Sequence, residues 1–401
     1  MRSPFLHPFA KPAADASDFV TIVRGEGALV WDDEGREYVD AMAGLWYCNI
    51  GHGRTEVADA VRSQMGELAT FHTFDRFTNR PVEALAGRLR ELAPFPEART
   101  FFTNSGSEAV ETAIKLARLT HWLAGDRDRT LVIGRAPSYH GVTTGALAVT
   151  GIPLNQEGYG PLLGGVIQVP AHDLDAMAEA FARHPGQVAA VLAEPVIGAG
   201  GVYPPRPGEL EGLRRLCDEN GALLVLDEVI SGFGRLGTWF AAEHFGVTPD
   251  LLTFAKAVTS GYLPLGGVLV SRRVLDVLES NPDLVLRHGH TYSGHPTACA
   301  AASASLAVTE REGLLEQAVK VGDRLSRGLR QLPLPEVRGE GAVWACALPE
   351  GRGALAVREH MMSAGVIARP LGTSTIAFCP PLVITDDQVD RCVEALAAAL
   401  A

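Results

Sequence analysis

The run ALLVLDEV at residues 222–229 decides the fold class of this chain. It predicts a buried strand that ends in an acid, Asp227. Further apolar or β-rich runs alternate with helical patterns along the chain. The strands are expected at 100–103, 130–133, 188–193, 222–226 and 266–270, and the helices at 108–122, 174–184 and 209–220. This alternation predicts an α/β fold, in which a mainly parallel sheet is flanked by helices.

The two ends of the chain have a different pattern from the middle. Short strands are expected at 27–31 and 38–39, and long helices at 297–309 and 314–329. Three more short strands follow near 343–348, 366–369 and 375–378. We therefore expect a large domain over residues 46–296 and a smaller α+β domain built from residues 1–45 and 297–401.

Composition excludes several classes of partner. The net charge is −12 and no arginine-rich or lysine-rich stripe stands out, which argues against nucleic acid and anionic membranes. The six cysteines are scattered without a C-x-x-C pair, so we expect buried free thiols in a reducing cytoplasm. No signal peptide or membrane-spanning run is visible. The spacing of His288, His290 and His295 fits no zinc motif, and we expect no metal site.

Lys256 follows Asp227 by one short segment and is one of only four lysines, against 31 arginines. An amine can form a Schiff base with an aldehyde, whereas a guanidinium does not lose its proton and cannot. A carboxylate at a strand end can keep a pyridine nitrogen protonated. The pair therefore suits pyridoxal 5'-phosphate (PLP), although a lysine near an aspartate is more often a surface ion pair.

A Ser-Gly-Ser sequence opens the helix that follows the strand at 100–103. The main-chain N–H groups at this helix start and the hydroxyls of Ser105 and Ser107 can hold a dianion such as phosphate. The alternative is a helix N-cap without any ligand, because serine with Glu108 close behind is good capping chemistry. Gly106 between the serines favours the anion, since glycine allows close backbone approach.

Three further side chains are candidates for the same site. Tyr139, followed by His140, could stack against a pyridine ring, or the pair could simply pack in a loop. Glu194 ends an apolar strand as Asp227 does. Ligands of open α/β sheets bind at the carboxyl edge of the strands, which is where both acids are expected.

Taken together, these motifs resemble the class III PLP-dependent aminotransferases of fold type I. The resemblance covers nearly the whole chain, because the family's motifs occur in the family's order. They are found at residues 104–109, 139–141, 226–229, 233–237, 249–250, 255–256 and 290–296. Residues 43–46 and 291–293 are most similar to the ω-amino acid:pyruvate group, also called β-alanine:pyruvate aminotransferases or ω-transaminases.

The resemblance implies a role for each cofactor-site residue. Ser105, Gly106 and Ser107 would bind the cofactor phosphate, and Tyr139 and Val229 would cover the two faces of the ring. Asp227 would pair with the pyridinium nitrogen, with Glu194 behind it and His140 in the same site. Lys256 would be the Schiff-base lysine and would carry the proton. Thr291 would reach the phosphate of a neighbouring subunit. This implies a homodimer with shared active sites, or a dimer of such dimers.

Substrates are expected to be a small amine and a keto acid, exchanged in a ping-pong cycle. Trp46 and Arg369 are the expected substrate-binding residues. Ornithine-like members carry a carboxylate-binding arginine where this chain has Ala377, whereas Arg369 matches the arginine of the ω-amino acid group. That favours pyruvate over 2-oxoglutarate, unless Arg369 is permanently paired with Glu340 or Asp386.

Rival functions remain open from the sequence. A 2-oxoglutarate-dependent relative is the nearest alternative. A decarboxylase or aminomutase of the same fold would share every cofactor residue. A dinucleotide oxidoreductase is excluded, because no G-x-G-x-x-G turn opens a helix after the first strand.

Overall fold

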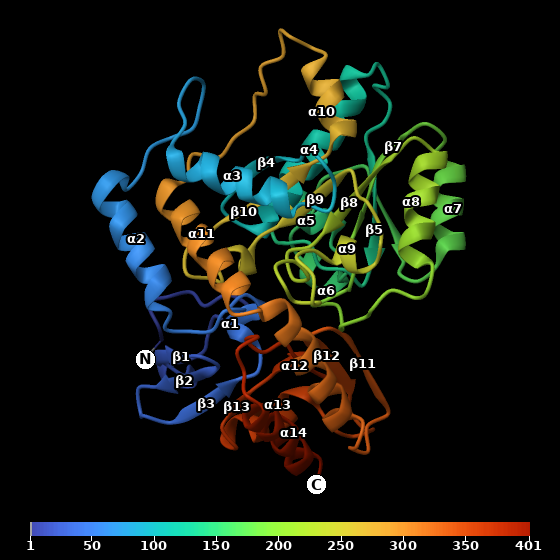
Figure 1. Ribbon diagram of the computed structural model, residues 1–401. Helices are drawn as coiled ribbons and strands as arrows, with labels where there is room; N and C mark the ends of the chain where they lie inside the picture. The colour runs from blue at the N-terminus through green and yellow to red at the C-terminus, as the bar shows by residue number, and fades with distance from the viewer. Residues whose placement is uncertain (1) are drawn as a thin grey trace.

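The computed structural model describes residues 2–401, and a seven-stranded sheet forms its centre (Figure 1). The strand order is β4, β10, β9, β8, β7, β5, β6. The bounds are Arg99–Thr103 (β4), Leu131–Ala136 (β5), Val166–Pro170 (β6), Val188–Ala193 (β7), Leu223–Asp227 (β8), Leu251–Phe254 (β9) and Gly266–Val270 (β10). Strand β10 is antiparallel to both neighbours and the other four pairs are parallel. The predicted α/β class with a mainly parallel sheet is confirmed.

Helices cover both faces of this sheet, which explains why its central strands are apolar throughout. Along β8, Leu224 and Leu226 pack on one face, and Leu223 and Val225 pack on the other. The first face is covered by α3 (Arg80–Leu92), α7 (Leu174–Arg183), α8 (Glu209–Glu219) and α11 (Pro296–Arg311), and the second by α4 (Gly106–Leu123), α5 (Thr144–Val149) and α10 (Arg272–Glu279). Helix α2 (Thr55–Leu68) packs on α11, and two short helices are α6 (Pro153–Gln156) and α9 (Ala241–His244).

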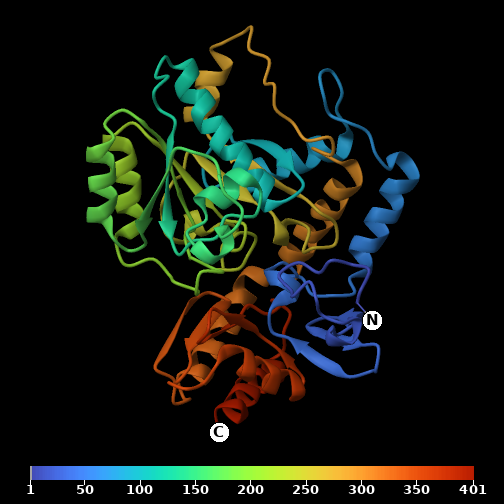
Figure 2. The same ribbon diagram turned by 180° about the vertical axis from the view of Figure 1, so that it is seen from behind.

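The two ends of the chain lie side by side below the central sheet (Figures 1 and 2). One small sheet joins β1 (Ile22–Glu26), β2 (Leu29–Asp32), β3 (Glu37–Asp40) and β13 (Val366–Ile367). A second sheet has the order β11 (Glu336–Glu340), β12 (Val343–Ala347), β15 (Thr375–Phe378), β14 (Arg369–Leu371). Helices α12 (Leu314–Leu329), α13 (Ala354–Ser363) and α14 (Asp386–Leu400) pack with these sheets around one apolar core. Both sheets use residues from the flanks, and the boundaries at 45/46 and 296/297 stay a proposal.

Several elements differ from the sequence expectation. Strands β1, β6, β9 and β11 were not predicted, nor were helices α1 (Ala43–Trp46), α2, α3, α5, α6, α9, α10, α13 and α14. The single strand expected at 366–369 is two strands, because β13 pairs with β3 while β14 pairs with β15 in the other sheet. A pattern of four residues cannot show that neighbouring positions belong to different sheets.

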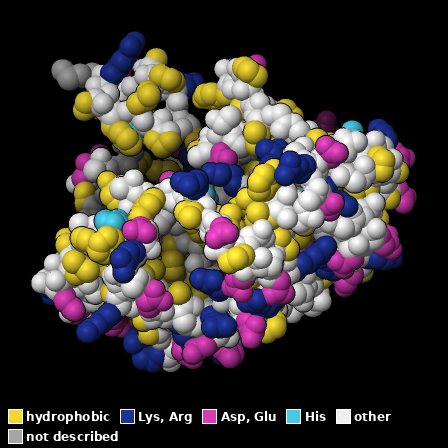
Figure 3. Space-filling model, turned by 90° about the horizontal axis from the view of Figure 1, so that it is seen from above, with side chains coloured by type: hydrophobic (Ala, Val, Ile, Leu, Met, Phe, Trp, Pro, Cys, Tyr) yellow, Lys and Arg dark blue, Asp and Glu magenta, His cyan; other side chains and the backbone are white. Residues whose placement is uncertain are grey.

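Charged side chains of both signs are mixed on the surface, and the cysteines are buried. On the face shown in Figure 3, lysine and arginine side chains lie among aspartate and glutamate rather than in a stripe. Within residues 2–401, no helix is long and apolar enough to cross a membrane, and no cluster of three or more histidine, cysteine or acidic residues could hold a metal ion. All six cysteines are buried and free, as predicted.

Candidate active site

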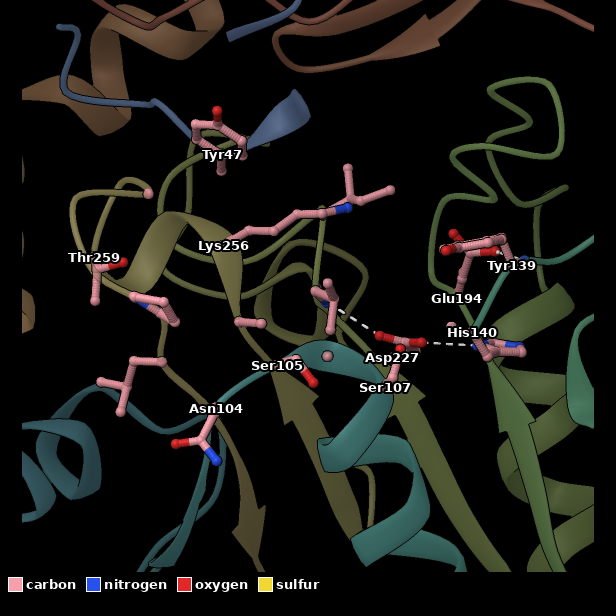
Figure 4. A pocket seen from close by; sticks show the side chains of 18 of the residues that line it. Tyr47, Asn104, Ser105, Ser107, Tyr139, His140, Glu194, Asp227, Lys256 and Thr259 are labelled. Carbon is pink, nitrogen blue, oxygen red and sulfur yellow. Dashed lines mark hydrogen bonds and ion pairs between the residues drawn. The ribbon is translucent and has the colours of Figure 1, made fainter. Parts of the chain in front are cut away.

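A cavity of about 320 Å³ opens at the carboxyl ends of the parallel strands. Nine of the residues singled out from the sequence line it: Ser105, Gly106, Ser107, Tyr139, His140, Glu194, Asp227, Val229 and Lys256. They come from segments more than 150 residues apart in the chain (Figure 4). The sheet edge brings them together, because the carboxyl ends of parallel strands open onto one side.

The start of α4 forms one wall of the cavity. Ser105 is the N-cap, and its hydroxyl accepts the main-chain N–H of Glu108 at 3.2 Å. The Glu108 carboxylate in turn accepts the main-chain N–H of Asn104 at 2.7 Å. A Cβ atom on Gly106 would lie 3.0 Å from both methyl groups of Val229. The expected capping hydrogen bond of Ser105 is therefore present. Gly106 brings the main chain and Val229 close together beside the remaining N–H groups of the helix start.

Asp227 is buried at the end of β8 and is held on both carboxylate oxygens. His140 Nδ1 lies 2.7 Å from Oδ2, and the Thr253 hydroxyl donates to Oδ1 at 3.0 Å. The main-chain N–H of Val229 also donates to Oδ1, at 3.2 Å. Figure 4 shows the Asp227 carboxylate beside His140, joined to it by a dashed line. Three hydrogen bonds fix the direction of a negative charge that faces the cavity.

Glu194 holds the loop that carries the aromatic ring of Tyr139. Its carboxylate accepts the main-chain N–H groups of Tyr139 at 2.8 Å and Gly198 at 2.9 Å. Burial raises the pKa of this carboxyl above its usual value, and the negative charge of Asp227 adds to the shift. Behind it, Arg135 donates to the main-chain oxygen of Glu194 and pairs with Glu209 at 2.7 Å. The loop is thus anchored by a buried ion pair.

Lys256 begins the short 3₁₀ helix after β9, with φ at 51°. This left-handed conformation costs roughly 1–2 kcal/mol for a residue with a side chain, so surrounding structure must hold it. Burial lowers the pKa of the Lys256 ammonium, while the carboxylates of Asp227 and Glu194 oppose that shift. A lysine with a lowered pKa is a better nucleophile and proton acceptor near neutral pH.

The donor set fits PLP. Free N–H groups and two serine hydroxyls suit a phosphate, and Val229 and Tyr139 offer apolar surfaces for a flat ring. The Asp227 carboxylate suits a protonated pyridine nitrogen, and the Lys256 amine suits an aldehyde. His140 Nε2 is buried without a hydrogen-bond partner in the described structure, which leaves His140 free to serve Asp227 alone on its other nitrogen.

Three expected site residues do not line the cavity. Trp46 is buried, with 4% of its surface exposed, and belongs to the same apolar cluster as Ile230, which lines the cavity. Thr291 is exposed and lies outside the cavity. Arg369 is half-buried at the start of β14 and makes no ion pair within residues 2–401. Its two suggested acidic partners are paired elsewhere, Glu340 with His244 at 3.2 Å and Asp386 with Arg324 at 2.9 Å, so that alternative was wrong.

Sequence reasoning also missed residues that the cavity uses. Tyr47 lines it, although the sequence suggested Trp46. Thr259 and Gly261 line it from the turn after Lys256. Thr253, which binds Asp227, lies opposite it in the register of β8 and β9. If β9 had been predicted, Thr253 could have been identified as a neighbour of Asp227, because the two residues lie opposite each other on adjacent strands.

Comparisons with known proteins agree with this geometry. The model of the family "Aminotransferase class-III" matches residues 11–400. A β-alanine–pyruvate aminotransferase of Pseudomonas aeruginosa is 34% identical, over 98% of this chain and 94% of that protein. A diaminobutyrate–2-oxoglutarate transaminase of Halomonas elongata is 35% identical, over 93% of this chain and 88% of that protein. The crystal structure of a thermostable (S)-enantioselective ω-transaminase from Thermomicrobium roseum superposes with a TM-score of 0.95 at 39% identity, over 98% of this chain and 95% of that one.

Proposed function

The chain belongs to the class III aminotransferases, which depend on PLP, and on that premise we propose that it transfers an amino group from an ω-amino acid or primary amine to pyruvate. The observation that carries the choice of substrate is Arg369, a half-buried arginine without an acidic partner among the described residues. Identity alone does not select the keto acid, because relatives named for pyruvate and for 2-oxoglutarate are equally similar.

PLP, when bound, withdraws electrons from the carbon that carries the amino group and stores that group between the two halves of the reaction. Ser105, Ser107 and the N–H groups at the start of α4 would hold its phosphate. Asp227 would hold the proton on its ring nitrogen, with His140 keeping the carboxylate in place. Nζ of Lys256 would take the proton from the amine-bearing carbon of the donor and deliver it to the carbon of the cofactor that carried the aldehyde.

In this proposal, Arg369 would bind the carboxylate of the keto acid. It pairs across the sheet with Ala377, the position where ornithine-like members carry their arginine. In this chain the guanidinium is therefore on the adjacent strand, directly opposite the position that carries the arginine in ornithine-like members. Its charge acts on the cavity, since it opposes the upward shift that burial imposes on the pKa of Tyr139. A planar guanidinium can hold a carboxylate by two parallel hydrogen bonds.

Half-reactions test this assignment. The holoenzyme is mixed with a panel of amines, and conversion of the cofactor to its amino form is followed by absorbance. The aminated enzyme is then mixed separately with pyruvate and with 2-oxoglutarate. Faster discharge by pyruvate supports the proposal. Faster discharge by 2-oxoglutarate would favour the alternative acceptor, and carbon dioxide or an isomerised amine as product would favour a decarboxylase or an aminomutase.

We further propose that the active unit is a homodimer, or a dimer of dimers, in which Thr291 completes the partner's phosphate site. Thr291 and Tyr292 are exposed. They adjoin the loop between α2 and α3, where Phe71, Phe74 and Phe77 are each at least 44% exposed. Large exposed aromatic clusters mark interaction surfaces. The dimer would be cytoplasmic, in keeping with six reduced thiols.

Sedimentation alongside activity tests the shared site. Thr291→Ala should weaken retention of PLP on dialysis, while Lys256 remains able to attach the cofactor. An active monomer at assay dilution would overturn the proposal.

A further inference from the structure

Asp40 and His52 join the two ends of a loop that reaches the cavity. Asp40 is the last residue of β3, and His52 is fixed by two main-chain hydrogen bonds to Gly27, at 2.8 and 3.0 Å. Nε2 of His52 lies 2.8 Å from Oδ2 of Asp40. The aspartate side chain is 4% exposed and the histidine 22%. The pair therefore closes the segment 41–51 at its base in a largely water-excluded setting.

The same carboxylate shapes the inside of the loop. It accepts the main-chain N–H of Met42 at 3.2 Å and that of Gly44 at 2.6 Å. Ala43, Gly44 and Trp46 all have left-handed φ angles, of 49°, 68° and 63°. Two of these residues, Ala43 and Trp46, carry side chains, for which that conformation is unfavourable. A loop of this kind persists only where outside bonds hold it, and Asp40 supplies them.

The loop places Tyr47 in the wall of the cavity. A Cβ atom on Gly44 would lie 2.4 Å from the Tyr47 ring, and one on Gly261 would lie 2.3 Å from it. The ring is therefore held between two glycines, one in the loop and one in the turn that follows Lys256. The main-chain N–H of Gly261 donates to the carbonyl of Lys256 at 3.3 Å. A shift of the loop would move the ring relative to the lysine.

A nucleophilic role for this cluster is disfavoured. Cys48 Sγ lies 3.6 Å from Nδ1 of His52, so cysteine, histidine and aspartate stand in a row, as they do in some hydrolases. Burial raises the pKa of the Cys48 thiol to about 12, which removes the reactive thiolate. Cys48 is also absent from the lining of the cavity. These observations favour a structural role for Cys48, His52 and Asp40 over a nucleophilic one.

We propose that Asp40 and His52 are positioning residues that fix Tyr47 and thereby set which amine donors the enzyme accepts. Neither side chain lines the cavity, so both act through the loop. The inference rests on the proposed function for its substrate and on the geometry alone for its effect on the loop. Its consequences are therefore measurable both in kinetics and in the protein without substrate.

Two substitutions at His52 separate the hydrogen bond from the bulk of the side chain. His52→Ala removes the donor to Asp40, whereas the amide of His52→Gln can restore it. We expect His52→Ala to raise KM for an arylalkyl amine about tenfold with little change in kcat, because small misplacements of binding groups are costly. His52→Gln should recover most of the affinity. His244→Ala, which removes a more exposed pair with Glu340, is the control.

Hydrogen exchange measures the loop directly, with or without PLP. The main-chain amides of residues 42–44 should exchange faster in His52→Ala than in the wild type, and those of β8 should not. If no amine reacts with any variant, the proposed function fails, while exchange still tests the pair. Unchanged exchange together with an unchanged KM would overturn the inference.

A double-mutant cycle tests whether the effect passes through Tyr47. If it does, His52→Ala should add almost nothing in a Tyr47→Ala background, because coupled residues are not additive. Additive losses would show that His52 acts elsewhere. If His52→Ala does not fold, Asp40→Asn replaces it in the cycle, since the amide keeps one acceptor and loses the charge.

Discussion

The two sides of the cavity are built differently. On the cofactor side, Asp227 has three hydrogen-bond donors and Glu194 has two, and both carboxylates are buried. On the proposed substrate side, Arg369 and Trp46 lie outside the lining of the cavity. Within residues 2–401 Arg369 has no ion pair, and the indole N–H of Trp46 is buried without a partner. The first side belongs to the central sheet and the second to segments from the ends of the chain.

The comparison indicates that the carboxylates proposed to act on the cofactor are held in place by hydrogen bonds, whereas the side chains proposed to bind the substrate are not. Groups that stabilise charge gain most when their direction is set in advance. Side chains that bind different amines and acids must be able to move, or must stay without a partner until the substrate binds. An arginine that is unpaired within residues 2–401 can bind a carboxylate without first breaking an ion pair.

The largest effect is expected at Lys256. Lys256→Ala should abolish covalent attachment of PLP and lower turnover by about 10³-fold or more, since loss of acid–base catalysis typically costs 10²–10⁴-fold. Borohydride reduction followed by peptide mass analysis should find the pyridoxyl group on Lys256 in the wild type. Lys115→Ala is the control. A label on Lys115 would contradict the assignment of the cofactor side.

Asp227→Asn should lower the rate of the amine half-reaction by about 10²-fold or more, because a neutral amide no longer favours a protonated ring nitrogen. Retention of PLP should change much less, as the phosphate contacts are untouched. Stopped-flow absorbance gives the rate and equilibrium dialysis gives the retention. Wild-type rates would show that the hydrogen bonds around Asp227 are merely structural.

Arg369→Ala should affect the two halves of the reaction unequally. KM for pyruvate should rise about tenfold or more, since a hydrogen bond to a charged group contributes about 1.5–3 kcal/mol. The half-reaction with an arylalkyl amine that lacks a carboxylate should change little. Equal losses in both half-reactions would mean that Arg369 supports the fold, and the contrast between the two sides would disappear.

The last prediction concerns stability rather than turnover, and it involves Glu228, which is fully buried beside Asp227. Its carboxylate accepts the main-chain N–H of Ala242 at 2.8 Å, yet burial raises the pKa of this carboxyl from 4.5 to about 7. The folded protein therefore binds the proton more tightly than the unfolded chain does. Stability should fall as pH rises from 4.5 to 7, by at most about 3 kcal/mol.

Glu228→Gln removes this titration. Denaturant unfolding measured across that pH range should give a flatter profile for the variant than for the wild type. If the free energy of unfolding fell equally steeply with pH in the variant and in the wild type, Glu228 would not be the titrating group.

The fold class and the family could be predicted from the sequence, and so could most of the residues that we propose hold the cofactor. Asp227, Lys256 and the Ser-Gly-Ser turn are recognisable because each depends on residue type and on its place at a strand or helix end. Such local patterns can be recognised in a sequence without knowing which residues lie on the neighbouring strands. The same reasoning placed Glu194 at the correct edge.

Only the tertiary structure decided which neighbours meet across strands and between the two ends of the chain. It paired His140 with Asp227, placed Arg369 opposite Ala377, and turned Tyr47 rather than Trp46 into the cavity. These contacts depend on register and on left-handed turns, and neither leaves a periodic trace in the sequence. Strand pairing is set by the packing of whole layers, and a short pattern carries no information about its partner.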